Sequence, residues 1–102
     1  MDVDTMETVD TVVRLAGHLD GRCSAEVREL LYDQVARYPD SDLVVDVSDV
    51  ESIDATALKV LAACSLRLDR DGRRVVLRGG SPSLRRLFAA TGWRRLFVWD
   101  RG

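Results

Sequence analysis

The clearest hydrophobic pattern in this 102-residue chain is an apolar run at residues 43–47, interrupted only by Asp46. The run is rich in β-branched side chains, as expected for a strand that is covered on both faces in a parallel sheet. We expect it to stop in the polar stretch 48–52. A helical pattern begins after Asp54. Apolar side chains then recur at helical spacing, at Leu58, Leu61, Ala62 and Leu68. The pattern predicts a buried strand that leads through a short loop into a helix.

Asp54 is the predicted N-cap of this helix. Its carboxylate can accept a hydrogen bond from the free amide of Thr56 or Ala57, and its charge complements the positive end of the helix dipole. Open α/β sheets bind their ligands where a strand is followed by a short loop and a helix N-terminus. We therefore expect function at this junction.

The chain before this junction predicts one strand and one helix. Residues 9–19 contain an alternating segment that predicts a strand ended by Gly17, and residues 20–21 are a turn signal. Ser24 is the predicted N-cap of a helix. The apolar stripe of that helix consists of Val27, Leu30, Leu31, Val35 and Tyr38. Residues 1–8 are polar and predict either a frayed end or a short edge strand.

The chain after the junction predicts a strand at 74–78, a further helix and a last strand at 96–99. Ser81 and Pro82 open the helix in the favoured order, a cap followed by proline. Its predicted apolar face consists of Leu84, Leu87, Phe88 and Thr91. Strands that alternate with helices imply right-handed βαβ units. We predict an α/β fold in which residues 1–102 form a single domain, with a mixed, mostly parallel sheet of four to five strands and about three helices.

Composition limits the location and the cysteine chemistry. The chain has no apolar run of the length that spans a membrane and no secretory signal, so we expect no membrane insertion and a cytoplasmic location. Cys23 and Cys64 lack CxxC spacing and neighbouring histidines, which argues against a zinc site and a disulfide framework. We expect ordinary thiols, with redox sensing as the alternative.

Charge is divided unevenly along the chain. Residues 1–54 hold fourteen acidic and four basic side chains, and residues 55–102 hold three acidic and eleven basic ones. Such a division can produce a dipolar surface that steers a charged partner, although a fold that interleaves the two halves is the simpler interpretation. The acidic half, and the lack of interleaved basic and aromatic residues, argue against direct binding of nucleic acid.

Signals of catalysis are sparse. His18 stands beside Asp20, but a catalytic pair needs a converging nucleophile, and a lone turn histidine is usually solvated. No P-loop or GxGxxG motif occurs, and the pair Gly79, Gly80 is more often a turn. Four carboxylates near the junction lack the spacing of a calcium loop, so solvation and helix capping are favoured over a cation site. They are Asp46, Asp49, Glu51 and Asp54. We predict no catalytic residue, metal or cofactor, and a binding module rather than an enzyme.

Four stretches together resemble STAS domains, the family of bacterial anti-sigma factor antagonists. Residues 54–58 stand where the family has Asp, Ser, Ser or Thr, Gly, Leu at a helix start. Residues 17–20 resemble the family's Gly, x, Leu, Asp before its first helix. Residues 74–77 resemble its next strand, and residues 81–93 resemble its segment with Ser, Pro, Leu, Phe and Gly. The order and spacing match over nearly the whole chain.

The resemblance implies a regulatory binding protein. Such antagonists bind an anti-sigma factor that is also a serine kinase, which displaces the sigma factor. The kinase phosphorylates the serine directly after the capping Asp, and a PP2C-type phosphatase reverses this. The phosphate adds about −1.5 to −2 charge and repels carboxylates in a tight interface. The implied partners here are an anti-sigma factor/serine kinase and a PP2C-type phosphatase, and the implied partner-binding residues are Asp20, Asp54, Ala55, Thr56 and Leu58.

The sequence departs from the family pattern at the phosphoacceptor. Ala55 occupies that position without a hydroxyl, and Ala57 replaces the usual glycine. Thr56 is a candidate substitute acceptor, but its side chain points about 100° further around the helix, and support of the cap is its simpler role. We favour binding that is constitutive or regulated in another way. Many relatives also continue into a C-terminal helix, whereas only residues 100–102 follow the last predicted strand. The resemblance then implies that part of the partner surface, or the cover of one sheet face, is missing or comes from another chain.

Two other classes of function stay open. The first is a STAS subunit of a bacterial lipid-transport ABC complex, which has a similar helix start and docks on an ATPase. In those subunits Thr follows Asp directly, whereas here it follows by two positions. The second is nucleotide binding at the amides of Thr56 and Ala57, which the nearby carboxylates disfavour unless a cation bridges them.

Overall fold

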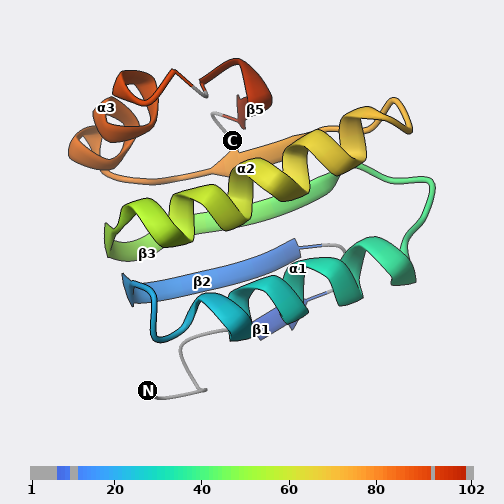
Figure 1. Cartoon of the computed structure of the whole chain (residues 1–102), viewed down its shortest axis with the longest axis horizontal. Helices are drawn as coiled ribbons and strands as arrows, with labels where there is room; N and C mark the ends of the chain where they lie inside the picture. The colour runs from blue at the N-terminus through green and yellow to red at the C-terminus, as the bar shows by residue number, and fades with distance from the viewer. Residues whose placement is uncertain (1–6, 10–11, 93, 101–102) are drawn as a thin grey trace.

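The computed structural model describes residues 7–9, 12–92 and 94–100. Its sheet has the strand order β1-β2-β3-β4-β5, in which β1 is antiparallel to β2 and the other pairs are parallel. The strands are β1 (Glu7–Val9), β2 (Val12–Leu19), β3 (Leu43–Ile53), β4 (Val75–Arg78) and β5 (Phe97–Asp100). The helices within these ranges are α1 (Ser24–Arg37), α2 (Ala55–Asp69), α3 (Pro82–Ala90) and the short 3-10 helix η2 (Arg94–Leu96). The predicted α/β fold with a mixed, mostly parallel sheet is confirmed (Figure 1).

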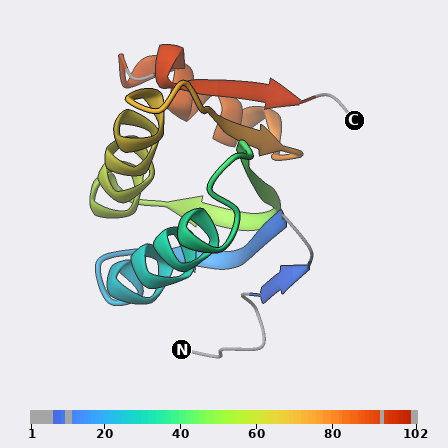
Figure 2. The same cartoon turned by 90° about the vertical axis from the view of Figure 1, so that its right-hand side faces the viewer.

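The helices α1 and α2 pack on one face of the sheet (Figure 2), and α3 contributes Leu84 and Phe88 to the same hydrophobic core. Alternate residues of the strands point toward them and are buried, whereas their neighbours along each strand are more exposed. The ring of Phe88 in α3 packs edge-on against Phe97 and Trp99 of β5, with ring centroids 5.3 and 5.5 Å apart. The chain therefore folds as two layers with one continuous hydrophobic core between them.

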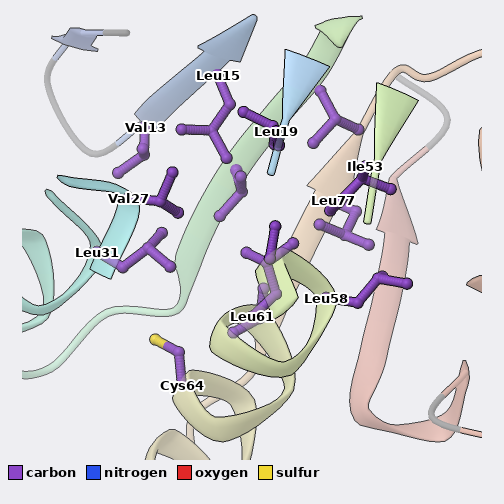
Figure 3. Packing of buried hydrophobic residues seen from close by; sticks show 14 of the residues in the cluster. Val13, Leu15, Leu19, Val27, Leu31, Ile53, Leu58, Leu61, Cys64 and Leu77 are labelled. Atoms are coloured by element: carbon purple, nitrogen blue, oxygen red, sulfur yellow. The ribbon is translucent and has the colours of Figure 1, made fainter. Parts of the chain in front are cut away.

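The core joins aliphatic side chains from the sheet with those of the helices (Figure 3). Several of the largest are less than 2 % exposed, among them Leu15, Leu31, Leu61 and Leu77. Full burial of one such side chain stabilises the fold by about 1.5–3 kcal/mol, so this cluster is the main source of stability.

The opposite face of the sheet presents two rows of side chains that cross the four parallel strands in register. One row consists of Val12, Val44, Val76 and Val98. The next row alternates in charge and consists of Arg14, Asp46, Arg78 and Asp100. Burial raises the pKa of Asp46, but hydrogen bonds from Ser48 and the charges of Arg14 and Arg78 outweigh this and bring that pKa below its usual value. Opposite charges on neighbouring strands stabilise a sheet by about 0.2–1 kcal/mol per pair, so these ionic neighbours strengthen the face that the described helices leave uncovered.

Two strands are longer than the sequence predicts. β2 continues beyond Gly17, which adopts a φ of +79° where the pairing with β3 shifts register. Gly17 therefore permits an irregularity within the strand and does not end it. β3 continues through the polar stretch 48–52, because these residues pair with the second half of β2. The predicted loop between strand and helix is thus reduced to Asp54.

Two details of the helices also differ from prediction. The N-cap position of α1 is Cys23, and Ser24 is the first helical residue. The Ser24 hydroxyl donates to the carbonyl of Gly21, at 3.0 Å, so it does not cap the helix. Leu87 is 39 % exposed and lies outside the buried face of α3, which is formed by Leu84 and Phe88. The predicted cap at Ser81 is confirmed, because its hydroxyl accepts from the amide of Leu84.

The two halves of the chain lie side by side and are not interleaved. Because the strand order follows the chain order, β1, β2, α1 and β3 form one side of the molecule and the later elements form the other (Figure 1). Among the described residues, ion pairs with N···O distances within 4.0 Å also stay within each half, as in Arg37 with Asp33 and Arg73 with Asp71. The charges of Asp46 and Arg78 meet across the boundary between the halves. The simpler interpretation of the charge division is therefore wrong, and an acidic side adjoins a basic side.

Replacement of Gly79 by alanine is expected to destabilise the fold more than replacement of Gly72. Both glycines have positive φ, of 80° and 73°, so alanine costs about 1–2 kcal/mol at either position. A Cβ at Gly79 would also clash with the Ser48 hydroxyl, whereas a Cβ at Gly72 meets no atom within 4 Å. We expect Gly79→Ala to lose about 1–3 kcal/mol more than Gly72→Ala in urea unfolding. Equal losses would contradict the close approach of Gly79 to Ser48.

Candidate functional site

The predicted junction forms where β2 and β3 end side by side. Leu19 and Ile53 are register partners at the carboxyl ends of these parallel strands. The amide of Asp54 then donates to the carbonyl of Leu19 at 2.9 Å, which extends the pairing by one bond. The loop that follows β2 and the first turn of α2 therefore lie together at one edge of the sheet.

Asp54 connects the two segments through both oxygens of its carboxylate. Its backbone is extended, with φ −95° and ψ 176°, and its Oδ1 accepts from the amide of Ala57 at 2.9 Å. Its Oδ2 accepts from the amide of Gly21 at 3.1 Å. The predicted N-cap is confirmed, with Ala57 as the donor. The same side chain also fixes the loop after β2 against the start of α2.

The loop after β2 is ordered by its own polar contacts. Asp20 accepts from the amide of Arg22 at 2.9 Å and from its guanidinium at 3.0 Å. The hydrogen bond from the Arg22 guanidinium has the largest effect on the pKa of Asp20, and the bond from the Arg22 amide has the next largest. Together they hold this pKa below its ordinary value of 3.8. Cys23 is 2 % exposed, and its Sγ accepts from the amide of Asp20 and donates to the Asp20 carbonyl, both at 3.3 Å. The Cys23 thiol is thus an internal part of the loop.

Cys64 lies in α2 and is fully buried, at 0 % exposure. Burial raises the pKa of its thiol to about 11. Because the thiolate is the reactive form of cysteine, Cys64 is unreactive near neutral pH. The location in the core favours the ordinary thiol that we expected over a redox sensor.

The five predicted partner-binding residues divide into a surface and its support. Asp54, Ala55 and Thr56 are exposed at the start of α2, and Asp20 is half-buried beside them. We call these four residues the junction surface. Leu58 is only 4 % exposed and packs in the core (Figure 3). Its burial does not fit a direct contact with a partner, and Leu58 instead anchors the first turn of α2 from below.

Three residues beside the junction form contacts that the sequence did not reveal. His18 and Ser52 are register partners, and His18 Nδ1 lies 2.6 Å from the Ser52 hydroxyl. His18 Nε2 lies 3.5 Å from a carboxylate oxygen of Glu51. The side chains of His18 and Glu51 are 67 % and 69 % exposed. His18 is therefore a strand residue in an open surface network, and the missed signal was the parallel register of β2 and β3.

The carboxylates that suggested a cation site lie mostly along a strand. Since β3 continues through residues 46–51, side chains there point to both faces of the sheet. Among residues 7–9, 12–92 and 94–100, no group of three or more His, Cys, Asp or Glu side chains is placed to hold a metal ion. In the same ranges, no helix has both the length and the apolar character needed to cross a bilayer.

Asp54→Ala is expected to lower the free energy of unfolding by about 1–2 kcal/mol, because the amides of Ala57 and Gly21 both lose their acceptor. Asp54→Asn keeps one acceptor oxygen and is expected to lose less. Amide hydrogen exchange at Gly21 measures the link to the loop directly, and it should accelerate in Asp54→Ala. Ser81→Ala removes the cap of α3 and serves as the matched control. Faster exchange at Gly21 in that control would contradict the assignment.

The acid titration of the loop follows from the contact between Asp20 and Arg22. The pKa of Asp20 in the folded chain is below 3.8. The stabilisation from this contact is therefore fully present at pH values above the pKa of Asp20 in the unfolded chain, and it disappears as the pH falls through the pKa of Asp20 in the folded chain. We expect Arg22→Ala to raise the pKa of Asp20, measured by NMR titration of its carboxyl carbon. Arg86→Ala, on α3, should leave it unchanged. An Asp20 pKa that does not respond to Arg22→Ala contradicts the hydrogen-bond geometry.

Comparison with known proteins places this geometry in a family. Residues 4–98 match the family model described as "Mlab, STAS domain". An anti-sigma factor antagonist from Mycobacterium paratuberculosis has a similar structure, with a TM-score of 0.78 and 27 % identity over 95 % of this chain and 83 % of that one. No curated protein sequence matches the chain.

Two more distant structures agree in fold. A candidate anti-sigma factor antagonist from Thermotoga maritima has a TM-score of 0.75 and 22 % identity, over 94 % of this chain and 85 % of that one. The Bacillus cell fate determinant SpoIIAA in its phosphorylated form has a TM-score of 0.68 and 18 % identity, over 94 % and 89 %. The chain belongs to the STAS domain family.

Proposed function

We propose that this STAS domain is a regulatory binding module that engages an anti-sigma factor with serine kinase activity, or a related switch protein. The observation that supports this most is the junction surface, an exposed helix start that Asp54 fixes against a neighbouring loop. The fold similarity to an anti-sigma factor antagonist at 27 % identity agrees with it. In this proposal the module acts by binding and not by catalysis.

The junction surface suits a protein partner because it is already ordered. Both carboxylate oxygens of Asp54 accept backbone amides, and Asp20 is held by Arg22. Ala55 and Thr56 are exposed between these fixed groups. A surface that is ordered in advance loses little conformational entropy when a partner binds. We propose that Asp20, Asp54, Ala55 and Thr56 contact the partner, with Leu58 as their support.

Binding and phosphorylation depend on different residues at the start of α2. Ala55 lacks the hydroxyl that a kinase would modify, so no phosphate can end binding at that residue. Thr56 is the candidate substitute, and it faces the loop, since a Cβ on Gly21 would lie 4.0 Å from its methyl group. A phosphate on Thr56 would repel the carboxylate of Asp54 nearby. We propose that no phosphorylation at Ala55 switches binding off, so that binding is constitutive with respect to this position. A PP2C-type phosphatase is then a partner only if Thr56 is phosphorylated.

A second candidate is the STAS subunit of a bacterial lipid-transport ABC complex, which would dock on an ATPase. The observation that favours it is the name of the matching family model, which is Mlab and not an anti-sigma factor antagonist. The same junction surface would then bind the ATPase. Identification of the partner distinguishes the two candidates.

Affinity capture of the tagged chain from its own cells, followed by mass spectrometry, tests the proposal. We expect the wild-type chain to retain an anti-sigma factor of the kinase type, and recovery of a transport ATPase instead would favour the second candidate. Ala55→Glu places a charge in the junction surface and should weaken binding of the purified partner about ten-fold or more. Ala89→Glu, at an exposed position of α3, is the matched control. Equal affinities of the two variants and the wild type would refute the junction surface as the interface.

The same purified partner tests phosphorylation. Ala55→Ser is expected to gain a phosphate when the chain is incubated with the kinase and ATP, and then to lose affinity, because the family's acceptor is restored. Thr56→Glu tests the substitute acceptor in the wild-type background. If Thr56→Glu binds as tightly as the wild type, Thr56 is not a switch.

A further inference from the structure

A shallow groove runs between α1 and α2 and begins at the junction surface. The part nearest the junction has a volume of about 300 Å³ and is lined by Arg28, Tyr32, Thr56, Lys59, Val60 and Ala63. It continues along α1 past Ser24, Ala25 and Glu29. Figure 1 shows that α1 and α2 run side by side over the sheet. Because Thr56 belongs to both features, the groove and the junction surface are continuous.

The floor of the groove is apolar. Val60 and Tyr32 are half-buried between the helices, and Ala63 is exposed. Leu66, one turn further along α2, is 53 % exposed and follows Lys59 by seven residues, which places it on the same side of the helix. An exposed leucine beside an apolar groove enlarges the surface that a partner can bury.

Three cations surround this floor. The guanidinium groups of Arg28 and Arg67 lie 5.8 and 5.3 Å from the ring centroid of Tyr32, and Lys59 lines the groove. None of these three pairs with a described carboxylate, whereas five arginines elsewhere in the described residues do. The paired arginines are Arg14, Arg22, Arg37, Arg73 and Arg78. The tyrosine ring orders both guanidinium groups and leaves their N–H donors available for carboxylates.

We infer that this groove docks an acidic amphipathic helix of the protein that binds the junction surface, an inference that rests on the proposed function. Apolar side chains on one face of such a helix would contact Val60, Ala63 and Tyr32. Carboxylates at its edges would pair with Arg28, Lys59 and Arg67. An amphipathic helix laid in a groove is a common mode of recognition, and Arg pairs with carboxylates through two parallel hydrogen bonds.

The size of protein interfaces also supports a contact beyond the junction surface. A stable interface uses about 800 Å² and about 20–30 residues on each partner, which the four residues of the junction surface cannot supply. The groove is a hollow that adjoins the junction surface at Thr56. Nucleic acid fits it less well, because Tyr32 is a single aromatic ring rather than a series of stacking rings.

The test uses a synthetic helical peptide with Glu on one face and Leu on the other, and a second peptide with Lys in place of Glu. Both are titrated against the ¹⁵N-labelled full chain. We expect the Glu peptide to shift the resonances of Tyr32, Val60 and Ala63, and the Lys peptide to leave them unchanged. The double variant Arg28→Glu/Lys59→Glu should weaken the Glu peptide about ten-fold or more. Its amide spectrum checks that the exposed substitutions leave the fold intact.

Arg86→Glu/Arg95→Glu makes the same change in charge on α3 and η2 and should alter the affinity less than about two-fold. The inference is overturned if both double variants weaken the peptide equally, if the Lys peptide binds as tightly, or if a single-stranded oligonucleotide binds the groove more tightly than the Glu peptide. With the purified partner, a loss of affinity in Ala55→Glu but not in Arg28→Glu/Lys59→Glu overturns the groove alone. A partner insensitive to Ala55→Glu counts against the proposed function instead.

Discussion

The carboxylate of Asp54 determines the geometry on which the site depends. One oxygen satisfies a free amide of α2 and the other accepts the amide of Gly21, while the Asp54 amide extends the pairing with β2. Two segments that follow different strands are thereby held as one surface. A bond to a charged acceptor is about twice as strong as a neutral one, so a single side chain can impose this arrangement at an exposed edge of the sheet.

The sequence predicted those parts of the site that depend on local chemistry. The caps at Asp54 and Ser81 were predictable because a capping side chain and its amide lie three residues apart. The bond from Gly21 to Asp54 was not, since it joins residues 33 positions apart and a backbone amide has no residue-specific signal. Polarity also misled the prediction of β3. Polar side chains at 48–52 indicated a loop, but the carboxyl end of this strand is open to solvent, and its backbone still pairs with β2.

In the proposed function, binding and phosphorylation at the first helical position need different atoms, and the chain has only the atoms proposed for binding. Positioning depends on the cap, the loop amide and the buried Ala57 and Leu58, all of which are present. Phosphorylation at the first helical position needs a hydroxyl, which Ala55 lacks. Absence of that hydroxyl leaves the cap geometry intact, because the hydrogen bonds of the Asp54 carboxylate go to the backbone amides of Gly21 and Ala57. Under the proposed function, the chain can therefore lack a phosphoacceptor at this position and keep the geometry of the junction surface.

The topology turns the uneven charge of the sequence into a spatial feature. Because the strand order follows the chain order, the acidic half and the basic half occupy opposite sides of the molecule. The groove between α1 and α2 lies at their boundary, with Glu29 on α1 and Lys59 and Arg67 on α2. Arg28, Lys59 and Arg67 attract an acidic helix to this groove, whereas Glu29 and the acidic half of the chain beyond it repel the helix, so the field orients it before contact. The same field acts on any charged partner that approaches the junction surface, and electrostatic steering of this kind raises the rate of association more than the final affinity.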